Sequence, residues 1–340
     1  MPDKRVSPYG SWESPISADL ITQGGLRLGE VRVDGADVYW HEGRPEESGR
    51  YVIVKRSADD SISEINPAPF NARNAVHEYG GSAYAVRDGE VFFTNWDDQR
   101  IYRASSDDGE PTAITEEPEI ELGIRFADLK LTNDSKWILS VRESHHEDRE
   151  ADNDLVAVPT DGSGAVVVLA SGHDFYSSPR QNPAGDMICW LSWDHPNMPW
   201  DGCELWVAEF DSSTGTTSNE QKVTGGADVS IVQPEWSPNG TLVFITDESG
   251  WWNLTKWSNG KITPILAEEK DHGGPAWAFG FSTYSFLEDG AIVLKGSKGT
   301  GGRFRMITPN GHEVAEAAAP HSLIAEVNVI GDDVAYIGAS

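Results

Sequence analysis

The sequence offers one run that looks suited to metal chemistry, His145–Glu150, which reads HHEDRE. A zinc-protease helix needs a second histidine one helical turn after the first, and the run ends instead at Glu150. The run also connects two predicted strands, 139–142 and 155–158, where a charged and solvated hairpin tip is the ordinary outcome. We therefore predict no metal ligands here and no cofactor for the chain.

A second set of candidates lies in a proline-rich segment between predicted strands 188–193 and 205–210. Its side chains His195, Trp200 and Asp201 are stiffened by two prolines. At a loop tip they could contact a substrate or a neighbouring domain, and the alternative is a simply packed turn.

Two further pairs could serve the same purpose. His77 and Glu78 precede a predicted innermost strand and could face a central channel, although the Gly-Gly that follows at 80–81 favours close structural packing. Trp251 and Trp252 occupy another tip, where they could anchor a ligand or a domain, or pack in the core. We predict these seven residues as substrate-cavity or interdomain candidates.

A serine nucleophile is missing from the sequence in its usual setting. The elbow pattern Gly-x-Ser-x-Gly, which presents a serine on a sharp strand-to-helix turn, occurs nowhere in it. The nearest match, Gly80–Tyr84, precedes a predicted strand with no helix after it. We assign no catalytic residue and expect the chain alone to be inactive.

The elements that would position these residues come from an internal repeat. A short apolar run, a turn containing Asp, Asn or Gly, and a second apolar run recur seven times, roughly 40 to 55 residues apart, a period typical of a four-stranded propeller blade. Asp-Gly and Asn-Gly turns such as 34–35 and 239–240 favour tight hairpins. Six units have a second, outer hairpin, whereas the seventh has only strands 327–330 and 334–337. The sequence predicts an all-β, seven-bladed propeller at 26–340 with an incomplete last blade, after an extension at 1–25.

Composition excludes several classes of partner. The 340 residues include 55 acidic and 26 basic side chains, a net charge of −29, which disfavours nucleic acid and anionic lipid. No apolar stretch approaches the length of a membrane span, and the start lacks a signal peptide pattern. Two cysteines, Cys189 and Cys203, are ordinary usage for a reducing compartment. We predict a cytoplasmic protein whose oligomeric state stays open.

Four motifs, in this order, resemble one known family. They are Tyr9–Ile16 (YGSWESPI), Tyr39–Glu47 (YWHEGRPEE), His77–Gly81 (HEYGG) and Trp193–Asp201 (WDHPNMPWD). Together they are similar to the propeller of the prolyl oligopeptidase family of serine peptidases, in its acylaminoacyl-peptidase and dipeptidyl-aminopeptidase-like branch. The resemblance implies a C-terminal α/β-hydrolase domain, not contained in this chain, that carries the Ser-Asp-His triad. It also implies that the propeller gates and selects short peptides.

Two other functions remain open from the residues alone. A free-standing propeller that serves as a binding platform needs no triad. A lactonase-type propeller hydrolase needs a metal held by carboxylate, Asn or His side chains that converge on the channel, and no compelling set is visible.

Overall fold

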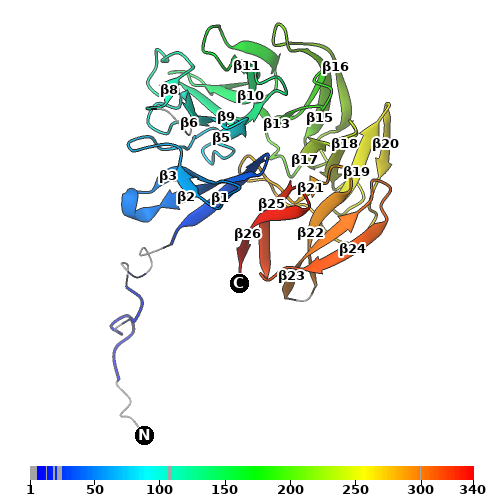
Figure 1. Ribbon diagram of the computed structural model, residues 1–340. Coiled ribbons are helices and arrows are strands. Elements are labelled where there is room, and N and C mark those ends of the chain that lie inside the picture. Colours follow the sequence, from blue (N-terminus) through cyan, green and yellow to red (C-terminus); the bar gives the residue numbers. More distant parts are fainter. Residues whose placement is uncertain (1–5, 13, 18–19, 21–24, 106–108, 299) are drawn as a thin grey trace.

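The computed structural model describes residues 6–12, 14–17, 20, 25–105, 109–298 and 300–340. Its strands form seven antiparallel sheets arranged in a ring, six with four strands and one with two (Figure 1). Within residues 25–105, 109–298 and 300–340, the only helix is the single turn η1 (Pro45–Glu47). The predicted all-β propeller is therefore confirmed, with six four-stranded sheets and a seventh that has two strands.

The strands follow one another along the chain, and we number the sheets in the same order. Sheet 1 contains β1 (Arg27–Asp34), β2 (Asp37–Arg44), β3 (Arg50–Arg56) and β4 (Ile62–Glu64). Sheet 2 contains β5 (Tyr84–Arg87), β6 (Glu90–Thr94), β7 (Ile101–Ser105) and β8 (Thr112–Ala113). Sheet 3 contains β9 (Ile124–Leu131), β10 (Trp137–Ser144), β11 (Asp152–Pro159) and β12 (Val167–Ser171). Sheet 4 contains β13 (Phe175–Gln181), β14 (Met187–Trp193), β15 (Glu204–Asp211) and β16 (Thr216–Gly225). Sheet 5 contains β17 (Ile231–Trp236), β18 (Leu242–Thr246), β19 (Asn253–Ser258) and β20 (Lys261–Pro264). Sheet 6 contains β21 (Tyr284–Phe286), β22 (Ile292–Lys298), β23 (Gly301–Ile307) and β24 (Glu313–Ala318), and sheet 7 contains β25 (Leu323–Ile330) and β26 (Asp333–Ala339).

The order of strands divides the connections between two faces of the ring. Each sheet is an antiparallel meander, so its first and third connections lie at one end and its second connection lies at the other. The links from one sheet to the next leave from the same end as the second connections. We call the face with those links and second connections the loop face, and the other the turn face. All seven candidate residues from the sequence lie in connections on the loop face.

The innermost strands share a local distortion that the sequence did not reveal. A non-glycine residue with positive φ interrupts the pairing at a bulge in five of them, and the five are Glu30, Asp128, Ser178, Gln233 and Glu326. A bulge turns the side chain of one residue away from its usual direction. Four of these residues use it to hold the next sheet.

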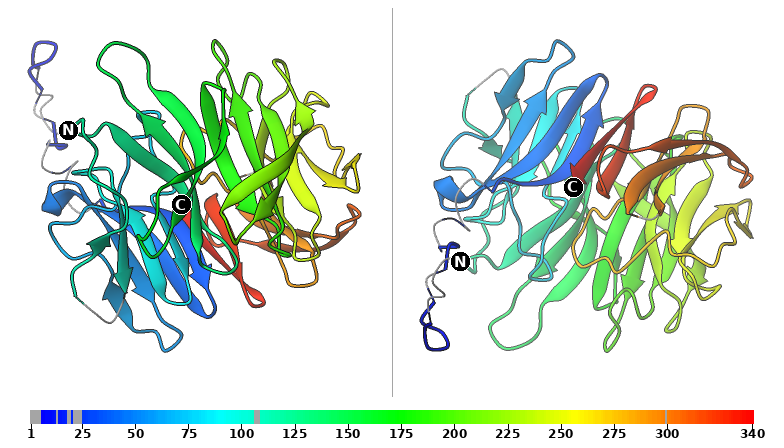
Figure 2. Two further views of the ribbon diagram at one scale, coloured as in Figure 1. Left: turned by 90° about the horizontal axis from the view of Figure 1, so that it is seen from above. Right: turned by 90° about the horizontal axis from the view of Figure 1, so that it is seen from below.

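These four side chains form what we call the inter-sheet clamps. The Glu30 carboxylate accepts the Ala83 N–H at 2.8 Å, and Asp128 accepts the Ser178 N–H at 2.6 Å. The other two clamps are Gln233 Oε1 to Thr283 N at 2.7 Å and Glu326 Oε2 to Val31 N at 2.9 Å. The last one joins sheet 7 to sheet 1, where Asn328 Nδ2 also donates to the Val31 carbonyl at 3.0 Å, so side chains and not a shared strand join these two sheets. Figure 2 shows the red sheet 7 between the blue sheet 1 and the orange sheet 6.

Apolar side chains fill the space between neighbouring sheets. Leu139 and Val141 of sheet 3 pack in one cluster with Tyr176, Ile188 and Trp190 of sheet 4, all nearly fully buried. Burial of each large side chain of this kind contributes about 1.5–3 kcal/mol. Central strands such as β14 and β18 are buried along almost their whole length, because a sheet packs against each of their faces.

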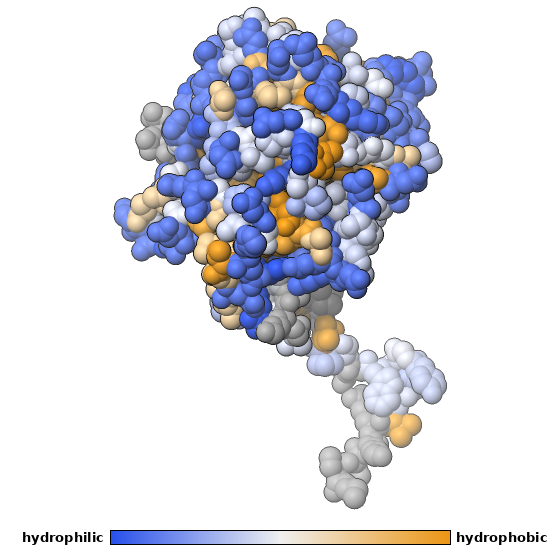
Figure 3. Space-filling model, turned by 90° about the vertical axis from the view of Figure 1, so that its right-hand side faces the viewer, coloured by the Kyte–Doolittle hydropathy of each residue, from blue (hydrophilic) through white to orange (hydrophobic). Residues whose placement is uncertain are grey.

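The face of the molecule in Figure 3 is mainly hydrophilic, with hydrophobic residues gathered in small groups near its middle. This agrees with the net charge of −29. Across the described ranges, no helix is long and apolar enough to cross a membrane. Cys189 and Cys203 are both buried with free thiols.

Candidate functional site

An aromatic cavity of about 330 Å³ opens on the loop face near the axis of the ring. Five parts of the chain line it: 76–80, the first hairpin of sheet 4 (175–180 with 191–193), 198–200, 231–233 at the start of sheet 5, and 276–281. We call it the aromatic cavity. Its aromatic lining consists of His77, Tyr79, Phe175, Trp193, Trp200, Trp277, Phe279 and Phe281.

The loop that carries His77 and Glu78 is held in an unusual conformation. Both residues have positive φ, at 52° and 64°, a region that non-glycine residues adopt only when the surroundings fix them. The buried Glu143 carboxylate accepts the His77 N–H at 2.9 Å, and the Arg125 guanidinium donates to the Ala75 carbonyl at 3.0 Å. Arg125 also pairs with Glu78 at 3.2 Å and leaves that side chain 80% exposed. Arg125 and Glu143 of sheet 3 thus hold the connection so that the Glu78 carboxylate lies exposed at the rim of the aromatic cavity.

The walls of the cavity are made of aromatic rings in mutual contact. Phe175 stacks on Trp193 with centroids 5.5 Å apart, and the His77 ring meets Phe175 edge-on at 5.0 Å. At the mouth, Trp200 contacts Trp277 at 4.4 Å. Such surfaces bind apolar side chains, and aromatic faces also attract cations. Burial lowers the pKa of His77 below its ordinary value, so its ring is neutral near pH 7.

Arg180 lies at the inner end of the aromatic cavity and is locked by two acids. Its Nε donates to Glu235 at 2.8 Å and its Nη1 to Asp128 at 3.2 Å. Burial alone would lower the pKa of Arg180, but the charges of Asp128 and Glu235 raise it above its ordinary value. This guanidinium is satisfied within the protein and forms a structural floor.

Three of the candidates from sequence, His77, Glu78 and Trp200, meet in the aromatic cavity. Two others flank it. The His195 ring Nδ1 lies 2.9 Å from Asp174, and the Asp201 carboxylate accepts the Met198 N–H at 2.9 Å. These two residues shape the 195–201 loop but do not line the cavity.

The structure keeps Trp251 and Trp252 apart from the aromatic cavity. Trp251 is 40% exposed at a loop tip. Trp252 packs against the cluster between sheets 5 and 6, and its carbonyl accepts the His272 N–H at 2.8 Å. Its contacts are those of a core residue that supports the 265–283 connection.

Sequence reasoning missed Trp277, Phe279 and Phe281, which form one side of the aromatic cavity. A usable signal was present, because a connection of this length without regular structure is uncommon and often functional. It also alternates aromatic with small residues, as 276–281 reads AWAFGF.

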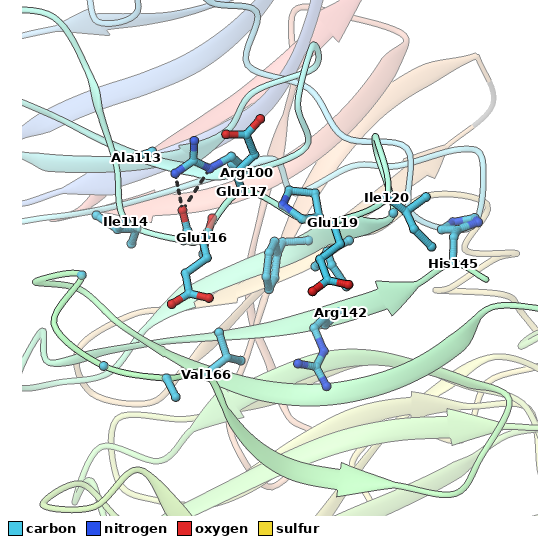
Figure 4. Close-up of a pocket in the computed structure, with 18 of the residues that line it drawn as sticks. Arg100, Ala113, Ile114, Glu116, Glu117, Glu119, Ile120, Arg142, His145 and Val166 are labelled. Carbon is cyan, nitrogen blue, oxygen red and sulfur yellow. Dashed lines mark hydrogen bonds between the residues drawn. The ribbon is translucent and has the colours of Figure 1, made fainter. Parts of the chain in front are cut away.

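A second cavity, of about 850 Å³, lies between sheets 2 and 3 (Figure 4). Its two arginines are already paired: Arg100 donates to the Thr115 carbonyl at 2.9 Å, and Arg142 contacts Asp154 at 2.5 Å. The acidic residues at its edge, Glu116, Glu117 and Glu119, are exposed. Its polar groups do not converge on a common point, so the aromatic cavity is the stronger candidate.

Comparison with solved structures points to one group of enzymes. The chain is 34% identical to a puromycin-hydrolyzing peptidase of Mycobacterium tuberculosis, with a TM-score of 0.87 over 98% of this chain. It is 33% identical to a puromycin hydrolase, with a TM-score of 0.88 over the same share. The chain matches the N-terminal propeller of prolyl oligopeptidase-family peptidases.

This chain spans about half the length of the matched proteins, since it covers 53% of both puromycin-hydrolysing structures. A prolyl endopeptidase structure shares 12% identity with a TM-score of 0.65, which shows the common fold alone. No protein-family model and no curated protein matches the sequence. The resemblance predicted from the four motifs is confirmed.

Proposed function

We propose that this chain is the gating and substrate-selecting propeller of a serine peptidase that hydrolyses short peptides and aminoacyl amides. The observation that carries the proposal is the match of 98% of the chain, at 33–34% identity, to about half of each puromycin-hydrolysing structure. The other half is expected to be an α/β-hydrolase domain with the Ser-Asp-His triad. The propeller alone is then inactive.

We infer that sheet 7 is the inner half of a seventh blade. The other six sheets have four strands, and within the described residues β26 pairs with β25 alone. A groove of about 470 Å³ runs beside it, lined by Trp40 of sheet 1 and by Val334, Tyr336 and Ile337 of β26. Two further strands from the rest of the protein would pair with this edge and cover the groove.

The residues that would select peptide substrates lie on the loop face, in and around the aromatic cavity. Aromatic walls suit a large apolar side chain, and the exposed Glu78 carboxylate at the rim suits the positive charge of a free amino terminus. His195 and Asp201 stand on the neighbouring loop, where a second domain would meet the propeller. A folded protein is too large to enter such a site, whereas a short peptide fits.

The experiment that tests the proposal begins with the gene. We expect the reading frame to continue for roughly 250–300 codons after Ser340, the length of a typical α/β domain, with a Gly-x-Ser-x-Gly motif after a strand. The longer protein should release nitroaniline from aminoacyl-p-nitroanilides and cleave puromycin, and a serine-directed inhibitor should stop both reactions. Hydrolysis of the same substrates by the 340-residue chain alone would contradict the proposal.

A further inference from the structure

Two long connections meet over the centre of the ring. One runs from β4 to β5 (65–83) and enters sheet 2, and the other runs from β20 to β21 (265–283) and enters sheet 6. The Phe279 N–H donates to the Gly80 carbonyl at 3.0 Å, and Gly81 and Phe279 form a parallel β-bridge. Sheets 2 and 6 are not neighbours, since sheets 7 and 1 separate them on one side and sheets 3 to 5 on the other. The two connections therefore cross the axis of the ring to reach each other.

Side chains reinforce this backbone contact. The His77 and Phe279 rings lie 5.0 Å apart, and Tyr79 and Trp277 lie 5.6 Å apart. The same loop also reaches sheet 4, because the His77 ring contacts Phe175. We call the joined segments 74–82 and 276–281 the axial strap. The orange connection that enters sheet 6 is seen crossing the ring in Figure 2.

The approach of the two backbones depends on glycine. A β-carbon on Gly81 would lie 2.6 Å from the Phe279 carbonyl oxygen and 2.9 Å from its nitrogen. A β-carbon on Gly80 would lie 2.3 Å from the Asn74 carbonyl oxygen. Both contacts are shorter than side chains tolerate, and both glycines have positive φ. Glycine at positions 80 and 81 thus allows the backbone of segment 74–82 to fold tightly and to approach Phe279 in segment 276–281.

A layer of charged side chains lies directly beneath the strap. The Arg32 guanidinium donates to Ser82 Oγ at 3.0 Å, next to the strap. Arg180, at the inner end of the aromatic cavity, pairs with Asp128 and Glu235, and the three residues lie on the innermost strands β9, β13 and β17. A peptide that passed along the channel would have to part the strap and then displace the buried Arg180–Asp128 ion pair.

We propose that the axial strap permanently closes the central channel at the loop face, so that ligands enter the aromatic cavity from the loop face and never through the channel. The inference rests on the proposed function for the nature of the ligand. The aromatic cavity is then a blind pocket, and peptides approach through the space between the propeller and its partner domain.

The first test measures the closure itself and needs no ligand. The Phe279 amide should exchange with deuterium on the order of 100-fold more slowly than an unprotected amide, as followed by NMR. Gly81→Val, which collides with Phe279, should abolish this protection. Gly89→Ala is the matched control, because Gly89 also has positive φ (77°) but meets nothing within 4 Å. Free exchange of the Phe279 amide in the unaltered chain would overturn the strap.

The second test measures the route. Ala36→Cys and Ala184→Cys lie in exposed turns on the turn face, at the ends of β1 and β13, and would carry a 5 kDa polyethylene glycol maleimide. Both native thiols are buried and should not react. The rate at which phenylalanyl-phenylalanine amide associates is followed by tryptophan fluorescence. With the polymer attached, this rate should stay within about twofold of the rate measured without it. The control is the same polymer on Ala58→Cys, in an outer turn of the same face.

The outcomes separate the two proposals. A tenfold slower association with the polymer on Ala36→Cys and Ala184→Cys, and not on Ala58→Cys, would show entry through the channel and overturn the strap. A dipeptide amide that fails to bind at millimolar concentration counts against the proposed function. In that case the exchange of the Phe279 amide still decides whether the channel is closed.

Discussion

The clamp between sheets 7 and 1 can be tested by mutation, and another clamp of the same chain suggests the conservative variant. Glu326 is partly buried and accepts the N–H of Val31, which is 4% exposed. In Glu326→Ala that N–H loses its partner inside the protein, at a cost of about 1–3 kcal/mol in the free energy of unfolding. Gln233 occupies the matching bulge of sheet 5 and accepts the Thr283 N–H through its amide oxygen at 2.7 Å. Glu326→Gln should therefore keep the clamp.

The charge of Glu326 adds a pH dependence to this comparison. Burial raises the pKa of its carboxyl group above the ordinary value of 4.5, against the opposing effect of Arg32. A raised carboxyl pKa means that the ionised form destabilises the fold at neutral pH, and that this cost disappears as pH falls through the raised pKa towards 4.5. We expect Glu326→Gln to equal or exceed the parent in stability at pH 7, with a difference that shrinks as the solution becomes acidic.

Urea unfolding followed by tryptophan fluorescence at pH 7 and at pH 5 provides the measurement. The reasoning would be refuted by an alanine variant within 0.5 kcal/mol of the parent, or by a glutamine variant as unstable as the alanine one. Thr214→Ala, at an exposed turn position, is the control, and its free energy of unfolding should match that of the parent.

Three further predictions concern buried polar groups. Arg180→Met should lower the free energy of unfolding by about 3–5 kcal/mol, because Asp128 remains buried without its cation, and urea denaturation measures the loss. Burial raises the pKa of Cys203 to about 12 and that of Cys189 above its ordinary value, so neither thiol should react with Ellman's reagent at pH 8 until urea unfolds the chain. Burial lowers the pKa of His41 to about 4, so the neutral ring favours the fold above pH 6.5 and that stability is lost as pH falls towards 4. Unfolding measured across this range should depend less on pH in His41→Leu.

The repeated hairpins could be predicted from sequence because local chemistry specifies them. An Asp-Gly pair such as Asp34-Gly35 favours a tight turn, and the apolar alternation on both sides fixes which face is buried. The same reasoning located the two strands of sheet 7. The inter-sheet clamps escaped it, because a bulge at Asp128 or Glu326 depends on contact with a sheet that is distant in sequence or, for Glu326, at the other end of the chain.

The candidate site was predicted in part for the same physical reason. His77, Glu78 and Trp200 belong to short motifs with unusual composition, and these motifs can be found without knowing the fold. Their partner Trp277 became visible only when the ring brought residues some 200 positions apart into contact, as its edge-on contact with Tyr79 shows. The sequence does not show where a loop tip lies in space, so it could not tell whether a tip residue such as Trp251 lines the aromatic cavity.

The clamps also bear on how such a ring can change over time. Each one needs only an oxygen acceptor at a bulge and a main-chain N–H on the adjacent sheet, and Asp, Glu and Gln all fill the role here. Because the clamp binds a main-chain N–H, it does not require any particular side chain on the adjacent sheet. Sheets joined in this way can diverge in sequence, or be gained and lost by duplication and deletion, while the rule that joins them stays the same.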